Sequence, residues 1–181
     1  MMKKLVFLML FFGGITLSST AQEINWVTIE EAVELQKKSP KKIMMDVYTT
    51  WCGPCKQLDK LTFHNKNVAR YVNENYYAVK FNGEGNKEIN YMGKVFKNPY
   101  YKPEDAFRRN TAHEFARYLQ ISAYPTIVFF DEYANVITPL RGYQNPSQLE
   151  LYLKMFKNDD HKKITSQEEF NTYFENFKSE F

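Results

Sequence analysis

Two closely spaced cysteines constrain this chain more than any other feature of its sequence. Cys52 and Cys55 are its only cysteines, and they enclose Gly53 and Pro54 directly after the apolar stretch 41–48. Proline favours the first turn of a helix, because its missing N–H has no partner to lose there. The pattern therefore predicts a buried strand that ends just before a helix, with Cys52 at the helix N-terminus and Cys55 one turn further in.

The spacing of the two cysteines favours redox chemistry over a structural role. A disulfide across so small a loop constrains the unfolded chain little, so it would add little stability. The free N–H groups and the dipole at a helix N-terminus favour a thiolate at Cys52, and a thiolate is the form that attacks a disulfide. We therefore expect the Cys52 sulfur to be exposed and Cys55 to be the shielded thiol that resolves the mixed disulfide. Gly53 leaves room for the backbone of a substrate.

The amino terminus has the layout of a secretory signal peptide. Lys3 and Lys4 precede an almost unbroken apolar run over 5–17, and small residues follow up to Ala21. About 13 apolar residues are too few for a membrane span, which needs roughly 20. We predict a signal peptide over 1–21, export to the periplasm or the extracellular space, and a single domain over 22–181. Disulfides persist in such compartments.

The charge balance and the remaining motifs exclude several classes of function. Lysine and arginine total 24 against 21 acidic residues, and removing Lys3 and Lys4 leaves 22 against 21. This balance argues against nucleic acid as a partner, and we expect a monomer. His64, His113 and His161 are too scattered to complete a zinc site with the cysteines, and no phosphate-binding glycine loop is present, so we predict neither metal nor cofactor.

Strand-like and helix-like segments alternate along the chain, which predicts an α/β fold with a mixed central sheet. Capping boxes mark two helix starts, at Thr28 with Glu31 and at Ser166 with Glu169. The expected strands are 24–27, 41–48, 76–81, 126–130 and 136–140, and the expected helices are 28–38, 53–65 continued by 68–73, 103–119, 146–156 and one from 166.

The hexapeptide Trp51-Cys52-Gly53-Pro54-Cys55-Lys56 after a strand resembles the active-site segment of the thioredoxin family. Other positions over 24–157 match this family in order: Asp46, Tyr48, Lys80, Tyr124-Pro125-Thr126 and Arg141-Gly142. The stretch 61–68 is closer to thioredoxin-like domains such as the carboxy-terminal domain of DsbD. The resemblance implies a three-layer thioredoxin-like fold and thiol–disulfide exchange with protein substrates. It also implies an electron donor or acceptor, such as a membrane thiol–disulfide interchange protein.

The resemblance also implies roles for individual residues. Asp46 lies among apolar neighbours, and as a buried acid it would take the proton from Cys55. Lys80 is either the charge partner of Asp46 or a solvated lysine at a strand end. A cis Tyr124–Pro125 bond would offer backbone groups to an extended substrate. The substrate groove would comprise Trp51, Gly53, Pro54, Tyr124, Pro125 and Gly142.

Three departures from the family are visible in the sequence. Lys60 replaces a proline that kinks the active-site helix, so we expect a straighter helix. The segment 83–110 is an insertion before the cis-proline loop, and a helix at about 166–179 is extra. The insertion is rich in aromatic and basic residues. These residues either pad the fold or form a surface that selects a partner.

Other functions use the same parts. A thiol oxidant would have the same cysteine pair, although Gly-Pro between the cysteines resembles the reducing members of the family. A metallochaperone would bind Cu(I) through Cys52 and Cys55 without turnover. A substrate-binding module would keep its function without either thiol.

Overall fold

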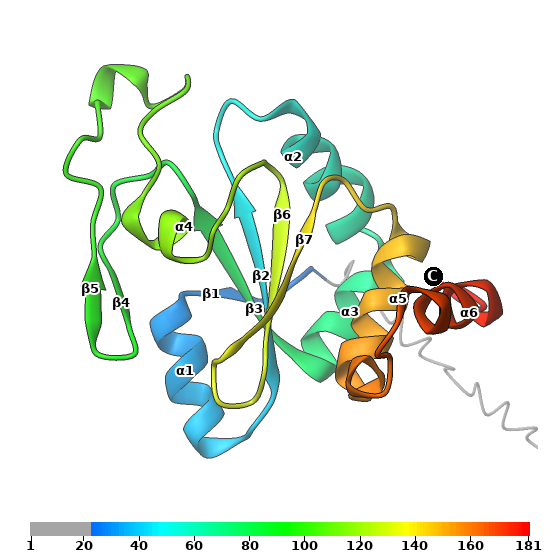
Figure 1. Ribbon diagram of the computed structural model, residues 1–181. Coiled ribbons are helices and arrows are strands. Elements are labelled where there is room, and N and C mark those ends of the chain that lie inside the picture. Colours follow the sequence, from blue (N-terminus) through cyan, green and yellow to red (C-terminus); the bar gives the residue numbers. More distant parts are fainter. Residues whose placement is uncertain (1–22) are drawn as a thin grey trace, which may run out of the picture.

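A five-stranded mixed sheet forms the centre of the protein in the computed structural model, which describes residues 23–181 (Figure 1). The signal peptide predicted over 1–21 lies outside the described residues. In spatial order the strands are β1 (Trp26–Val27), β3 (Tyr76–Asn82), β2 (Lys42–Tyr48), β6 (Thr126–Phe130) and β7 (Val136–Arg141). The first three are parallel to one another, whereas β6 and β7 are antiparallel to their neighbours. The predicted α/β class with a mixed sheet is confirmed.

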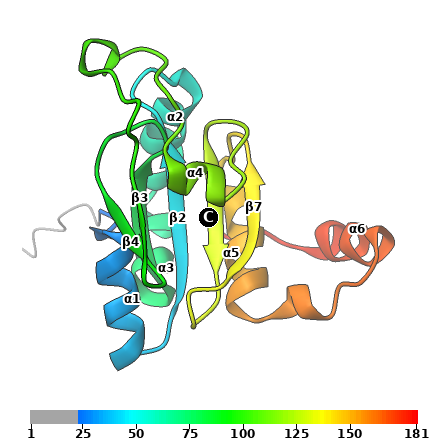
Figure 2. The same ribbon diagram turned by 60° about the vertical axis from the view of Figure 1, so that its left-hand side comes forward.

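Helices cover both faces of this sheet and complete three layers (Figures 1 and 2). One apolar cluster holds residues of α1 (Ile29–Lys38) and α4 (Glu114–Tyr118), and a second holds residues of α3 (Lys66–Asn75) and α5 (Pro146–Lys157). The α1 helix starts at Thr28, whose capping box with Glu31 is present as predicted.

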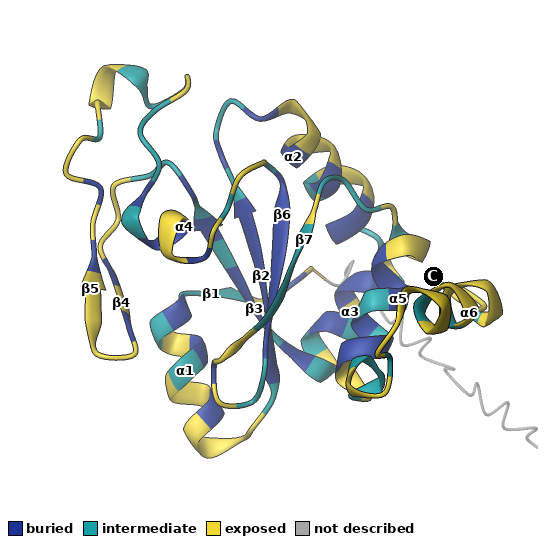
Figure 3. Cartoon of the chain, in the orientation of Figure 1, coloured by how far each residue is buried: buried dark blue, intermediate teal, exposed yellow. Residues whose placement is uncertain are grey.

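The central strand β2 is buried on both of its faces (Figure 3). Side chains alternate along a strand, so Ile43, Met45 and Val47 enter the first cluster whereas Met44 enters the second. Asp46 is two residues after Met44, so its side chain points to the same face of the strand, which is the face of the second cluster. This alternation places a carboxyl group in the layer that also holds the helix after the cysteines.

The active-site helix, which we expected to be straighter because Lys60 replaces a proline, changes its winding partway along. The α-helix α2 covers only Gly53–Gln57, and a π-helix continues it over Leu58–Phe63. Leu58 and Phe63 are five residues apart and both are buried in the second cluster. The five-residue hydrogen-bond step of a π-helix allows both side chains to face the sheet, whereas α-helical winding would turn one of them away.

The segment 83–110 contains a hairpin that the sequence analysis did not anticipate. Strands β4 (Ile89–Tyr91) and β5 (Lys94–Phe96) pair through a two-residue turn at Met92 and Gly93. Both turn residues have positive φ, of 53° and 74°, which is the geometry of tight hairpin turns. The hairpin contributes Ile89, Tyr91 and Phe96 to the first cluster.

The helix predicted over 103–119 is wrong. A single 3₁₀ turn covers Pro103–Asp105, and α4 begins only at Glu114. Between them the backbone groups bond elsewhere: the Ala106 carbonyl accepts a hydrogen bond from Thr50, and the N–H of Asn110 donates to Glu84. The His113 side chain then accepts from the N–H of Phe115 and caps α4.

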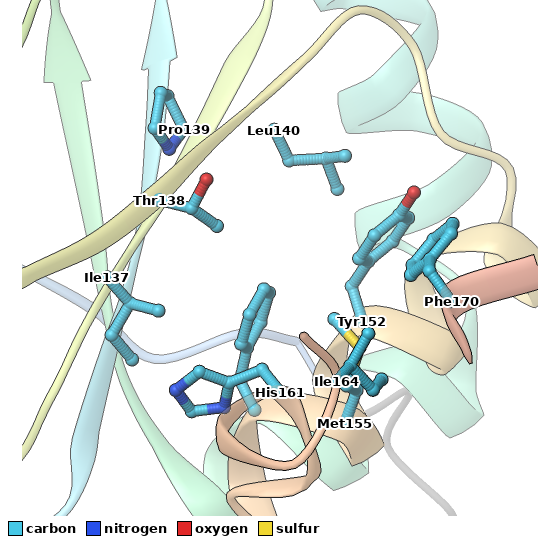
Figure 4. A pocket seen from close by; sticks show the side chains of 10 residues that line it. Ile137, Thr138, Pro139, Leu140, Tyr152, Met155, His161, Ile164 and Phe170 are labelled. Carbon is cyan, nitrogen blue, oxygen red and sulfur yellow. The ribbon is translucent and has the colours of Figure 1, made fainter. Parts of the chain in front are cut away.

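The C-terminal segment leads from α5 to α6 (Gln167–Asn176), which starts at the predicted Ser166–Glu169 capping box. It leaves an open hollow of about 340 Å³ between β7, α5 and the segment before α6 (Figure 4). Within residues 23–181, no helix is both long enough and apolar enough to cross a bilayer.

Candidate active site

Cys52 and Cys55 form a disulfide at the start of α2. Their Cα atoms are 5.3 Å apart, and the Cys52 sulfur caps the helix by accepting a hydrogen bond from the N–H of Cys55 at 3.1 Å. The Cys52 sulfur was expected to be exposed, but in this oxidised form Cys52 is only 2% exposed and Cys55 6%. The disulfide and the N–H bond both hold the Cys52 sulfur against the first helical turn. Gly53 is exposed, and a Cβ added there would meet no atom within 4 Å.

Asp46 is a buried carboxyl group beneath this helix. It is 2% exposed, and its Oδ1 has no hydrogen-bond partner among the described residues. Burial raises the pKa of Asp46 to about 7, although the Lys80 charge acts against this rise. A carboxyl with a pKa near neutrality can both accept and release a proton at physiological pH.

Lys80 lies next to Asp46 but is bonded mainly to another acid. Asp46 and Lys80 are register partners in the parallel β2–β3 ladder, and Lys80 Nζ is 4.0 Å from Asp46 Oδ2. Its closer partner is Asp59 in the π-helix, which makes a hydrogen bond and an ion pair with it. The ammonium group also lies over the rings of Trp26 and Tyr48, at 5.1 and 5.5 Å. Lys80 is therefore shared between two acids, while 29% of its side chain stays exposed.

Asp59 was missed by the sequence analysis. Its spacing carried a signal, because Asp59 follows Cys55 by four residues and such positions share one helix face. The negative charge of Asp59 also raises the pKa of Asp46. Asp59 thus acts on Asp46 in two ways, by direct repulsion and by holding Lys80.

Asp59→Asn is expected to lower the pKa of Asp46. The substitution removes a nearby negative charge and frees Lys80 to pair with Asp46, and both effects favour the ionised carboxylate. If turnover depends on Asp46, its pH profile should move to lower pH, which stopped-flow measurements of disulfide exchange from pH 5 to 9 would show. The control is Glu74→Gln, on an exposed position of α3. An identical profile in the two variants would contradict the coupling.

Cys55, Asp46 and Asp59 line one open hollow of about 490 Å³. Tyr48, Thr49 and Lys80 line it as well, and the Thr49 hydroxyl is a second buried polar group without a partner among residues 23–181. The hollow thus brings together three of the four predicted catalytic residues. Cys52 does not line it.

The predicted proline loop lies against Trp51. The Tyr124–Pro125 peptide bond is cis, and the Pro125 carbonyl accepts a hydrogen bond from the N–H of Gly142 at 2.9 Å. Gly142 has φ of 87°, a conformation that suits glycine. The Tyr124 ring meets Trp51 edge-on, with 6.2 Å between the ring centroids. Contacts therefore link Trp51, Tyr124 and Gly142 to the proline loop.

The insertion also contacts the site, which the sequence analysis did not predict residue by residue. Glu84 Oε2 accepts hydrogen bonds from Trp51 Nε1 at 2.7 Å and from the N–H of Asn110 at 2.8 Å. The Arg109 guanidinium lies 4.8 Å from the centre of the Trp51 ring. Glu84 and Arg109 therefore hold the indole ring from two sides. In the part of the chain described here, no three metal-binding side chains cluster.

Known proteins resemble this chain in sequence over most of its length. DsbD, the thiol:disulfide interchange protein, from Pectobacterium atrosepticum is 24% identical over 146 residues, which is 78% of this chain and 21% of that protein. DsbD from Yersinia pestis is 25% identical over 150 residues, which is 79% of this chain and 21% of the relative. The chain therefore spans about a fifth of the length of these relatives.

Solved structures show the same fold. A thioredoxin-fold protein from Helicobacter pylori superimposes with a TM-score of 0.55 at 18% identity, over 74% of this chain and 79% of that one. A thioredoxin from Thermus thermophilus gives a TM-score of 0.54 at 17% identity, over 74% and 87%. Residues 29–157 match the family described as thioredoxin-like domain. Because this match covers four of the five strands, the cysteine pair and the proline loop, the chain belongs to the thioredoxin-like domain family.

Proposed function

We propose that this protein is an exported thiol–disulfide oxidoreductase that reduces or exchanges disulfides of other proteins. The observation that carries the proposal is the placement of Cys55 and the buried Asp46 on one hollow, directly behind the Cys52–Cys55 disulfide. Family membership supports it, since two DsbD relatives are described as thiol:disulfide interchange proteins. The N-terminal sequence pattern supports export.

The reaction begins with the reduced pair. The Cys52 thiolate attacks one sulfur of a substrate disulfide, forming a mixed disulfide and releasing the other substrate sulfur as a thiolate. Cys52 is the attacking residue because it caps α2, where backbone N–H groups stabilise a negative sulfur, and because exposed Gly53 leaves the approach open. The approach surface comprises Trp51, Pro54 and the Tyr124–Pro125 loop.

The second step releases the product. Cys55 gives its proton to the Asp46 carboxylate and attacks the Cys52 sulfur, which forms the Cys52–Cys55 disulfide and releases the second substrate sulfur as a thiolate. Two electrons thereby pass from the cysteine pair to the substrate. A dithiol protein must then reduce the pair for another cycle, and a membrane thiol–disulfide interchange protein is the class we propose for it.

An insulin-reduction assay with dithiothreitol as the donor tests the proposal. The wild-type protein should accelerate insulin precipitation, and the Cys52→Ser/Cys55→Ser double variant should not exceed the uncatalysed rate. A Cu(I) titration of the reduced protein in parallel separates the alternatives. Stoichiometric copper binding without insulin reduction would favour a metallochaperone, and a wild type that neither reduces insulin nor binds copper would favour a binding module.

A further inference from the structure

The insertion forms a closed lobe beside the active site. We use the name insertion lobe for residues 83–113, because the N–H of His113 donates to the carbonyl of Gly83 at 2.8 Å and so joins the two ends. Asn98 bridges the interior through bonds to the carbonyls of Gly85 and Thr111. Gly83 lies so close to Tyr124 that an added Cβ would be 2.6 Å from its ring. The lobe therefore starts in contact with the cis-proline loop.

The two halves of the lobe have different surroundings (Figures 1 and 2). The β4–β5 hairpin packs on the core and on α1, where Glu30 accepts a hydrogen bond from the N–H of Asn90. Lys94 of the hairpin lies over the rings of Phe96 and of Tyr118 in α4, and Lys97 just after the hairpin pairs with Glu88. The other half rises to the end of the sheet where α2 begins. The two alternatives for this segment therefore apply to different halves. The hairpin pads the fold, and the other half offers a surface beside the active site.

Residues 106–110, here called the rim loop, are attached to the active-site segment. The Ala106 carbonyl accepts from the Thr50 hydroxyl at 2.6 Å, Arg109 lies on Trp51, and Asn110 donates to Glu84. These contacts fix both ends of the loop next to the cysteine pair. A side chain between them is consequently held at a defined place on the rim.

Phe107 is that side chain, and its apolar ring lies open to solvent. It is 84% exposed, more than any other large apolar side chain of residues 23–181, and it lines the hollow that holds Cys55 and Asp46. Exposing a phenylalanine to water is unfavourable, and a partner that covers it recovers this free energy. Its place beside the reactive sulfurs makes a disulfide-bearing partner the molecule that would cover it.

The charges around Phe107 are of both signs, with positive charges in excess. Lys56 lines the same hollow, and Arg108 follows Phe107 in the loop; both are exposed and neither forms an ion pair with the residues that the structure describes. Two of the nearby acids are engaged, since Asp59 binds Lys80 and Glu84 binds Trp51, whereas Glu104 and Asp105 in the turn before the loop form no ion pair with the described residues. Lys56, Arg108 and Arg109 outnumber Glu104 and Asp105, so the net charge here is positive and favours an acidic partner segment.

We infer that Phe107 and Arg108 select protein substrates in which an apolar and an acidic residue lie beside the disulfide. This inference rests on the proposed function and adds its substrate class. Phe107 receives the apolar side chain, and Arg108 with Lys56 attracts the acidic one, mainly by raising the encounter rate. Because the Phe107 ring projects into solvent, it suits contact with the surface of a partner protein better than contact with a small molecule enclosed by the hollow.

Single-turnover kinetics with designed peptides test the inference. The full chain is reduced beforehand and mixed with four synthetic peptides, each with one intramolecular disulfide flanked by leucine or serine and by aspartate or lysine. The wild type should reduce the leucine peptides about 10-fold faster than the serine peptides. It should also prefer aspartate to lysine, and this preference should shrink as salt is added. Phe107→Ser should abolish only the leucine preference, and Arg108→Glu should reverse only the charge preference.

Two controls separate the possible outcomes. Tyr133→Ser removes an aromatic ring that is 79% exposed in the turn between β6 and β7, at the other end of β6 from Pro125, and it should keep both preferences. Bis(2-hydroxyethyl) disulfide, which is small and neutral, should be reduced equally by all variants. If the wild type reduces this small disulfide but treats the four peptides alike, the inference is overturned and the proposed function stands. The inference is likewise overturned if Phe107→Ser slows the small disulfide as much as the leucine peptides. A wild type that reduces no disulfide overturns both.

Discussion

Cys55→Ser is expected to accumulate covalent complexes with substrate proteins, whereas Cys52→Ser should accumulate almost none. Without Cys55 the mixed disulfide on Cys52 has no internal thiol to resolve it, so it persists until an external thiol arrives. Non-reducing gels of envelope extracts, probed for this protein and then run again with reductant, would show the complexes. The double variant supplies the background.

The surroundings of the two sulfurs, and not their exposure, support this expectation. Both cysteines are buried in the oxidised form, so accessibility does not distinguish them. Their surroundings do: Cys52 caps the helix next to the open position of Gly53, and Cys55 lines the hollow that contains Asp46. Equal trapping by the two single variants would mean that either sulfur can attack, and the assigned roles would then be wrong.

The parts of the fold that local patterns determine were predictable from the sequence. The capping boxes at Thr28 and Ser166 mark helix starts correctly, because they involve side chains and backbone only three residues apart. The apolar runs of β2 and β6 identify buried strands for a similar reason. The β4–β5 hairpin escaped notice because its turn is Met92-Gly93, and methionine is not a residue that signals positive φ.

The active-site residues also divide into those that local sequence patterns reveal and those that they do not. The cysteine pair and Asp46 carry short-range signals, since each is fixed by its place on one strand or one helix. The Lys80–Asp59 pair and the Trp51–Glu84 bond join residues 21 and 33 positions apart, and such contacts depend on how separate elements pack. The failure of the predicted helix over 103–119 has this cause too, because Thr50 and Glu84 take the backbone groups that a helix would need.

Asp46→Asn is expected to slow resolution of the mixed disulfide without preventing its formation. The asparagine side chain cannot accept the Cys55 proton, while the surroundings of Cys52 stay unchanged. Turnover should fall about 10- to 100-fold, the lower range for loss of a general base. Alkylation of Cys52 by iodoacetamide should proceed at the wild-type rate. A variant with unchanged turnover from pH 6 to 9 would show that Asp46 has no part in proton transfer.

The same substitution should change how stability depends on pH. Burial raises the pKa of Asp46 from 3.8 to about 7, so between these values the native state keeps a proton that the unfolded chain has lost. The free energy of unfolding of the oxidised wild type should therefore fall as pH rises through this window, by up to about 4 kcal/mol, and level off above pH 7. Asp46→Asn lacks this decline, so its advantage over the wild type should grow from pH 4 to 7. Urea unfolding at a series of pH values measures the difference, with Glu74→Gln as the surface control. Parallel stability curves for wild type and Asp46→Asn would mean that the carboxyl group is already ionised in the native protein, and that it could not be poised to exchange a proton with Cys55 near neutral pH.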